Sequence, residues 1–243
     1  MFSQEAAPPP AVVAVEATTL DLAETSDFNG RLDANRRVAL VARVSGVIEE
    51  IGFAPGAEVT QDQTLFVIER DLYEAAAREA EGALRAAKAQ RDLAQIERDR
   101  QSELVAREAG AQARLDQAEA ALATAEADVL RLEAAHDRAR TNLSYTEIKA
   151  PFAGRIGNTA VDAGGIVGPE SGALATLVQL DPIHAEFPVP TATLRNFLER
   201  VERGEVSKEA AVSLTLANGT VYDAPGDVDF VDSRVNSGTD SVT

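Results

Sequence analysis

The sequence predicts an elongated, multidomain α+β fold, in which an antiparallel α-helical hairpin is inserted between the two halves of a small β-sandwich. A partial β-barrel domain is expected beside it. Three observations lead to this prediction. A β-rich segment recurs later in the chain, a proline-free run of helix-forming residues separates the two copies, and the remaining segments carry the alternation and turn signals of strands.

The N-terminus begins MFSQEAAPPPA, which contains three consecutive prolines and no basic flank followed by an apolar core. We therefore expect residues 1–11 to form a disordered linker. We also expect that any export signal or membrane anchor of the natural protein was removed ahead of this start.

The β-rich repeat begins at Ala42, where ARVSGVIEEIGFAPGAEV aligns without a gap with APFAGRIGNTAVDAGGIV from Ala150. Each copy reads as a strand, a glycine, a second strand and a glycine turn that leads to a third strand. One copy is too small to bury a core, so residues 38–70 and 144–175 are predicted to pair about a pseudo-twofold axis. The glycines expected to provide positive φ or close approach are Gly46, Gly56, Gly154 and Gly164.

The stretch between the copies, residues 71–143, is rich in Ala, Glu, Arg, Gln and Leu, which favour helix. Its second part has a heptad, whose seam is predicted at Leu115, Leu122, Val129, His136 and Leu143. The other seam position holds Ala118, Ala125, Leu132 and Ala139. The first part is looser, with Tyr73, Ala80, Ala87 and Ala94 beside Ala76, Ala83 and Leu84.

The helical stretch is predicted to break at Gly110, in REAGAQARLD, so that two helices fold back on each other. At about 1.5 Å per residue, each arm of the hairpin extends about 50 Å. An arm of this length cannot pack onto so small a sandwich and must project from it. The outward faces, solvated or reserved for neighbouring copies, are predicted to carry Glu81, Arg85, Lys88, Arg91, Asp92, Glu119, Glu126 and Arg131.

The remaining chain, residues 12–37 and 176–243, is predicted to form a β-barrel domain with one helix. PIHAEFPV alternates, Thr191 is expected to cap the helix TLRNFLERVERG, and Asn218-Gly219 signals a hairpin. No strand follows GDVDFVD, although a barrel needs more strands to close. We therefore expect the chain to be truncated inside this domain.

Composition excludes several classes of function. The net charge of -17, spread over the chain, disfavours nucleic-acid binding, and the absence of cysteine excludes disulfides and thiolate sites. His136 and His184 have no ligand-spaced neighbours, and DAGGIVG lacks the Lys and Ser or Thr of a P-loop. We predict no catalytic, cofactor-binding or metal-binding residues, and a protein that is not an enzyme.

The repeat, the inserted hairpin and the segments LSYTEIKAPFAGRIG and GALATLVQLDPIHAEF together resemble a known family. They are similar to the periplasmic adaptors, or membrane fusion proteins, of resistance-nodulation-division (RND) efflux pumps. The residues that carry the resemblance are Tyr145, Ala150, Pro151, Gly154, Arg155 and Ile156, and then Leu180, Asp181, Pro182 and Ile183.

The resemblance implies a biotinyl/lipoyl-like sandwich, a hairpin and a β-barrel in a periplasmic protein attached to the inner membrane. It implies three partners: an inner-membrane RND transporter, a TolC-type outer-membrane channel, and further copies of the chain in a hexamer. The family's channel-contacting Arg, Leu and Ser signature at the hairpin tip falls here on Arg100, Leu104 and Ala111. Ala111 departs from that signature, which weakens docking unless another group such as Gln112 compensates.

Three alternatives are weighed against this interpretation, and only the first of them stays open. An adaptor of an ATP-driven exporter shares the hairpin and the half-motif, although LVQLDPI favours the proton-driven class. A biotinyl or lipoyl carrier requires a lysine where the halves join, and no lysine lies between Arg43 and Ala87. A purely structural coiled coil would not explain the two matching β units.

Overall fold

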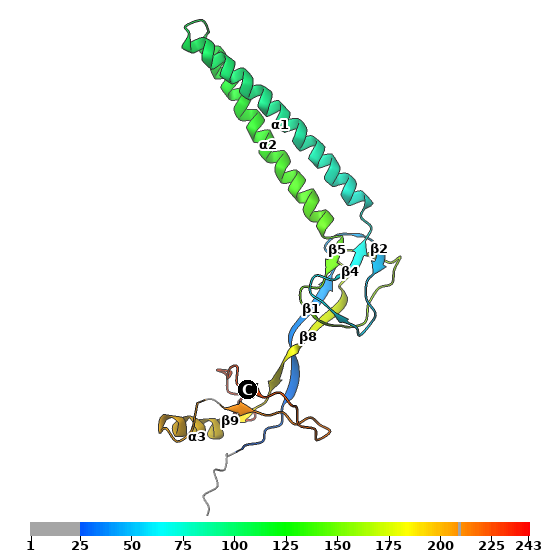
Figure 1. The fold of residues 1–243 in the computed structure, drawn as a ribbon, viewed down its shortest axis with the longest axis vertical. Coiled ribbons are helices and arrows are strands. Elements are labelled where there is room, and N and C mark those ends of the chain that lie inside the picture. Colours follow the sequence, from blue (N-terminus) through cyan, green and yellow to red (C-terminus); the bar gives the residue numbers. More distant parts are fainter. Residues whose placement is uncertain (1–24, 209) are drawn as a thin grey trace, which may run out of the picture. The chain divides into compact units, whose positions relative to one another are not determined.

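The computed structural model describes residues 25–208 and 210–243, so the linker predicted over residues 1–11 lies outside the described residues. The chain divides into two compact units. One unit comprises residues 32–185 and holds the sandwich and the hairpin (Figure 1). Among the described residues, the other unit comprises residues 25–31, 186–208 and 210–243. The predicted barrel boundaries fall inside strands β1 (Arg31–Val41) and β8 (Ala173–Glu186), and the domain limits stay a prediction.

The sandwich consists of two four-stranded sheets, ordered β1-β8-β6-β3 and β5-β4-β2-β7. The sequence alternates or carries β-branched residues along these strands, which suits a pleated, half-buried surface. Their remaining bounds are β2 (Gly46–Ile51), β3 (Glu58–Val59), β4 (Thr64–Ile68), β5 (Glu147–Lys149), β6 (Gly154–Ile156) and β7 (Ile166–Val167).

The two repeats complete each other by exchanging a strand. Strand β2 of the first repeat pairs with β7 of the second, and β3 of the first pairs with β6 of the second, both antiparallel. The registers match, since Gly46 lies opposite Val167 and Gly154 lies opposite Val59. The predicted clasp of two half-motifs is therefore confirmed.

The core lies between these sheets and is drawn from both repeats. Ile48 and Ile156 occupy equivalent positions and are 1% and 0% exposed, and Phe66, Leu65 and Leu177 are fully buried with them. Burying each such side chain contributes about 2 kcal/mol of transfer free energy. Because each repeat supplies about half of this apolar surface, neither repeat is stable alone.

The hairpin is formed by α1 (Asp71–Ala106) and α2 (Gln112–Ser144), which lie side by side and antiparallel (Figure 1). Helix α1 leaves the end of β4 and α2 returns to the start of β5, and these two strands are paired with each other. The predicted antiparallel hairpin, inserted between the sandwich halves, is confirmed. Gly110 lies in the connecting loop.

Two details predicted for the α1 seam are wrong. Ala76 is exposed, and Ala77 is the half-buried residue at that level. Arg91, predicted on the outward face, is half-buried at a seam position. Between Tyr73 and Leu84 the apolar residues of α1 are alanines, so the sequence pattern does not distinguish which of them faces α2.

The second unit holds short strands and one helix. Its elements are β9 (Val189–Pro190), α3 (Thr191–Glu202), β10 (Ala211–Val212), β11 (Gly226–Asp227) and β12 (Ser241–Val242). Helix α3 begins at Thr191 with Pro190 in the cap position, so the predicted capping by Thr191 is wrong. The hairpin turn at Asn218-Gly219 is confirmed, since Gly219 has a φ of 83° and Leu216 N donates to Thr220 O at 2.8 Å.

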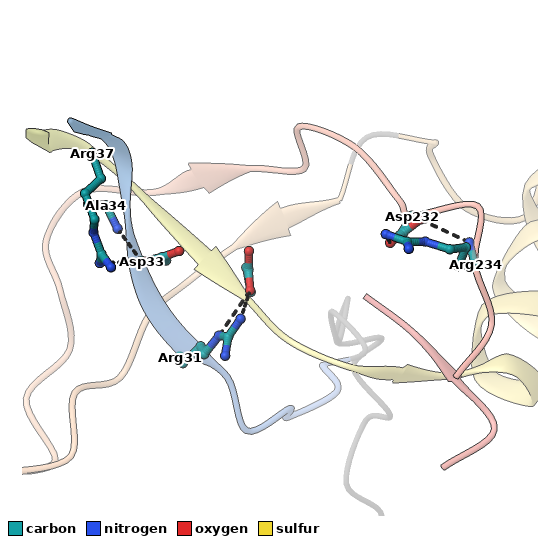
Figure 2. A network of polar contacts seen from close by, with 7 residues as sticks. Arg31, Asp33, Ala34, Arg37, Asp232 and Arg234 are labelled. Atoms are coloured by element: carbon teal, nitrogen blue, oxygen red, sulfur yellow. Dashed lines mark hydrogen bonds and ion pairs between the residues drawn. The ribbon is translucent and has the colours of Figure 1, made fainter. Parts of the chain in front are cut away.

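Local polar contacts hold the edges of the strands and loops (Figure 2). Arg31 donates to the Glu186 carboxylate at 2.8 Å, and Asp33 accepts hydrogen bonds from Ala34 N and the Arg37 guanidinium. In the C-terminal segment, Arg234 N donates to the Asp232 carboxylate at 3.0 Å. These contacts are exposed, so we assign them a small share of the stability.

Candidate functional site

The hairpin tip is a short loop closed by backbone hydrogen bonds. Glu108 N donates to Val105 O and Ala109 N donates to Leu104 O, each at 2.9 Å, so the chain turns tightly after α1. Glu108 takes a φ of 56°, a conformation that suits a tight turn. A Cβ on Gly110 would lie 3.0 Å from Leu104 Cβ and 3.1 Å from Val105 N. A glycine is therefore needed where the loop crosses back over the last turn of α1.

Arg100 and Leu104 lie four residues apart on α1, which places them on one face of the helix near the tip. The Arg100 side chain is 62% exposed and pairs with Glu97 at 2.5 Å, within the same helix. Leu104 is 38% exposed although it is a large apolar residue. This face therefore presents a cation beside an unburied leucine.

Ala111 occupies the N-cap position of α2, with φ -88° and ψ 130°. This extended conformation suits a serine or threonine cap, but alanine has no side-chain acceptor and no side-chain cap hydrogen bond is formed. The structure thus brings all three predicted tip residues to the same end of the hairpin. The missing hydroxyl at position 111 leaves a backbone donor of α2 without its usual side-chain partner.

The predicted α2 seam faces α1 along most of its length. Leu122 and Val129 are each 8% exposed, while Leu115, His136 and Leu143 are half-buried. Ala118 and Ala125 are also buried. This packing holds α2 against α1 along the seam.

The predicted glycines divide into two pairs. Gly56 and Gly164 adopt φ values of 78° and 88°. A Cβ on Gly154 would lie 2.2 Å from Val178 O, and one on Gly46 would lie 2.6 Å from Ile68 Cγ2. Positive φ is thus found at the turn pair, and close approach is found at the strand pair.

A polar cluster that was not predicted from the sequence joins the hairpin to the sandwich. The guanidinium of Arg70, directly before α1, pairs with Glu147 at the start of β5, and Glu147 also pairs with Lys149 at 3.2 Å. Tyr73 donates its hydroxyl proton to Ser45 O at 2.7 Å. We call these residues the root cluster. The sequence signal for this cluster was the presence of a charged residue, Arg70 or Glu147, at each junction between a helix of the hairpin and a strand of the sandwich.

Two shallow hollows flank the hairpin near its root. One hollow, of about 390 Å³, is lined by Glu74, Ala77, Arg78, Glu81, His136, Arg140 and Leu143. The other, of about 470 Å³, is more apolar and is lined by Leu72, Tyr73, Ala76, Ala135, Arg138, Ala139 and Asn142. The two flanks of the hairpin therefore differ in chemistry.

Across residues 25–208 and 210–243, no group of three or more metal-binding side chains comes together. Within that part of the chain, no helix has both the length and the apolar character that crossing a bilayer requires.

Comparison with known proteins places this geometry in a family. Residues 36–184 match the domain described as "RND MFP, barrel-sandwich hybrid domain". The chain is 38% identical over 241 residues to the efflux pump periplasmic linker BepF of Brucella suis, covering 98% of this chain and 59% of that protein. It is 35% identical over 243 residues to the solvent efflux pump periplasmic linker SrpA of Pseudomonas putida, covering 98% and 60%.

The solved structures agree on the fold. A putative efflux transporter from Bacteroides eggerthii superposes with a TM-score of 0.61 at 18% identity, covering 88% of this chain and 59% of that one. The chain spans about 60% of the length of the curated relatives it matches. The domain match over most of the chain, together with these relatives, shows that it belongs to the RND membrane fusion proteins.

Proposed function

We propose that this protein is the periplasmic adaptor that links an inner-membrane, proton-driven RND transporter to a TolC-type outer-membrane channel for the efflux of drugs and other xenobiotics. The relatives BepF and SrpA are named as periplasmic linkers of efflux pumps. RND membrane fusion proteins are structural linkers and not enzymes, so the work proposed here is docking and sealing.

The observation that carries the proposal is the exposed face of Arg100 and Leu104 at the end of a long, packed hairpin. An exposed leucine beside a cation, carried at the end of a long helix, is suited to insertion into a shallow apolar site with a polar rim. We therefore assign channel contact to Arg100, Leu104 and the neighbouring position 111.

We assign the contact with the transporter to the unit of residues 186–243. We further propose that the full-length protein is attached to the inner membrane. This unit exposes several large apolar side chains, among them Phe230 at 70% and Val221 at 58%. Exposed apolar surface of this kind is typical of protein contact sites.

We assign self-association, as a hexamer in the assembled pump, to the flanks of the hairpin. One flank of α1 is almost free of charge and carries Leu72, Ala76, Ala83, Ala86 and Leu93, and Arg131 and Arg138 follow on the same side of α2. The opposite flank of α2 is acidic, with Asp116, Glu119, Glu126, Glu133 and Asp137 around the exposed Leu130. An apolar, weakly basic flank of one copy complements an acidic flank of the next, as repeated head-to-tail contacts in a ring require.

The tip assignment is tested by Leu104→Asp in the full-length protein, expressed in a strain that lacks the chromosomal copy. We expect efflux to be lost, measured as drug sensitivity equal to that of the deletion strain, because a charge would enter an apolar contact. Circular dichroism of the variant should show unchanged helix content, since Leu104 is exposed.

The matched control is Ala127→Asp, which adds the same charge to an exposed position in the middle of α2. Efflux should persist in this variant, and normal drug resistance in the Leu104→Asp strain would overturn the tip assignment. Purification of the full-length protein together with its bound partners separates the proposal from its alternative. An RND transporter among these partners supports the proposal, whereas an ATP-driven exporter favours an adaptor of that class.

A further inference from the structure

The seam of α1 changes character halfway along the hairpin. From the root, its seam positions hold Tyr73, Ala77, Ala80, Leu84 and Ala87, which are apolar or aromatic. Beyond them the same seven-residue spacing from Leu84 places Arg91 and Arg98 at the seam, with side chains only 39% and 33% exposed. In the half of the hairpin nearer the tip, two of the α1 seam positions are therefore arginines, and the others hold the half-buried Ala94, Gln101 and Val105.

The ion pairs recorded for these arginines are not with carboxylates of α2. Tyr73 shares a hollow with Asn142, and Ala76 shares it with Ala139, which sets the antiparallel register. Continued along the helices, this register places Arg91 near Thr124 and Arg98 near Gln117, each next to a buried alanine, Ala125 and Ala118. The small alanines leave room for the arginine stems, and neither Thr124 nor Gln117 carries a charge that neutralises a guanidinium.

The ion pairs of both arginines turn away from the seam. Arg91 pairs with Asp92 at 2.7 Å and Arg98 pairs with Asp99 at 3.2 Å, each its neighbour in sequence. The two aspartates are 63% and 56% exposed, so they lie on the solvent side. A charged residue at a seam position lowers coiled-coil stability, and these pairs with exposed carboxylates recover little of that loss.

The charges within the terminal helix turns at the tip add no compensating support, although Arg107 follows α1 as its C-cap and pairs with Glu103. The last turn of α1 contains no basic residue and includes Glu103, while the first turn of α2 contains no acidic residue and includes Arg114. Both charges oppose the helix dipole, and Ala111 supplies no cap. At the root, by contrast, Asp71 and Glu74 occupy the first turn of α1.

We propose that the pairing of the two helices is less stable on the tip side of Arg91 than on the root side. Residues 91–125 then open and close locally in the free chain while the root half stays paired. Local opening is expected where buried apolar contacts are few and helix ends are unsupported. If the tip docks as proposed above, this freedom lets it adjust to its site without moving the sandwich.

Hydrogen–deuterium exchange of the complete chain, followed by peptide mass spectrometry, tests the boundary. Amides of residues 94–106 and 113–125 should exchange at least about ten times faster than those of residues 75–87 and 127–140. In the double variant Arg91→Leu with Arg98→Leu, exchange near the tip should slow about tenfold or more, while exchange at the root stays unchanged. Size-exclusion chromatography of the same samples shows whether the double variant self-associates. If it does, the single variants Arg91→Leu and Arg98→Leu are used instead, and each should slow exchange near the tip by a smaller factor.

The matched control is Arg85→Leu with Lys88→Leu, which removes two cations from exposed positions of α1. It should leave exchange near the tip as in the natural protein. Equal protection along the whole hairpin of the natural protein would overturn the proposal, and so would an equal slowing by the control pair. Exchange is measured on the free chain, so a negative result here leaves the Leu104→Asp efflux test unaffected.

Discussion

At the scale of single residues, position 111 shows how one side-chain oxygen bears on both stability and docking. Ala111 has the extended backbone of an N-cap and lacks the acceptor that such a position normally supplies. The family signature expected here has serine. A hydroxyl at this position would serve the first turn of α2 whether or not a channel is present.

We predict that Ala111→Ser raises the unfolding free energy of the hairpin by about 1 kcal/mol, because the hydroxyl accepts a hydrogen bond from a free backbone N–H. Thermal unfolding followed by circular dichroism measures the change. Ala109→Ser, an exposed loop residue two positions earlier, is the control and should have no effect. Equal melting of all three proteins would show that position 111 does not act as a cap.

The root cluster gives a second prediction at this scale. Arg70 and Glu147 are 39% and 28% exposed, and Arg70 Nε is buried without a hydrogen-bond partner. Glu147→Gln removes one of the two carboxylates that pair with this guanidinium, the other being Glu74 at 3.5 Å, and we expect a loss of about 1 kcal/mol in urea unfolding. The Glu58 side chain is 83% exposed and pairs with Arg155, so Glu58→Gln should leave the free energy of unfolding unchanged. A loss of the same size in both variants would contradict the assigned role of the root cluster.

At the scale of elements, the seam of α2 was predictable and that of α1 was not. Leu115, Leu122 and Val129 recur every seventh residue and fix which face of α2 turns inward. In α1 the alanines are interchangeable, so the pattern did not distinguish Ala76 from Ala77 or place Arg91 at the seam. The root cluster was missed because its residues are far apart in sequence and meet only after the two sheets have formed.

The seam itself is tested by comparing two leucines of α2. Leu122 is 8% exposed and Leu130 is 68% exposed, although both lie in the same helix. We expect Leu122→Ala to lower the unfolding free energy by about 2 kcal/mol, and Leu130→Ala to lower it by less than about 0.5 kcal/mol. Chemical denaturation, monitored by the helical circular dichroism signal, measures both changes. Similar losses of unfolding free energy in the two variants would exclude the proposed seam.

At the scale of the whole molecule, the repeat predicts the strand exchange, because two half-motifs that cannot bury a core alone must complete each other. The repeat does not predict that substitution of the equivalent glycine has different effects in the two copies. A Cβ on Gly154 would lie 2.2 Å from the backbone carbonyl oxygen of Val178, whereas a Cβ on its counterpart Gly46 would meet a side-chain methyl of Ile68 at the longer distance of 2.6 Å.

We therefore expect Gly154→Ala to destabilise the sandwich by about 2 to 3 kcal/mol and Gly46→Ala to destabilise it by less, because only the first forces strands β6 and β8 apart. Urea unfolding of both variants measures the difference. The reverse order would contradict the close-approach role assigned to Gly154.

The central claim, that the end of the hairpin docks an outer-membrane channel, is tested most directly by photo-crosslinking in living cells. A photoreactive amino acid placed at position 104 of the full-length protein should yield a crosslinked species that contains a TolC-type channel, identified by mass spectrometry. The same group at position 127 should not. Crosslinks from position 104 that never contain such a channel, in cells whose pump is active, would contradict the account.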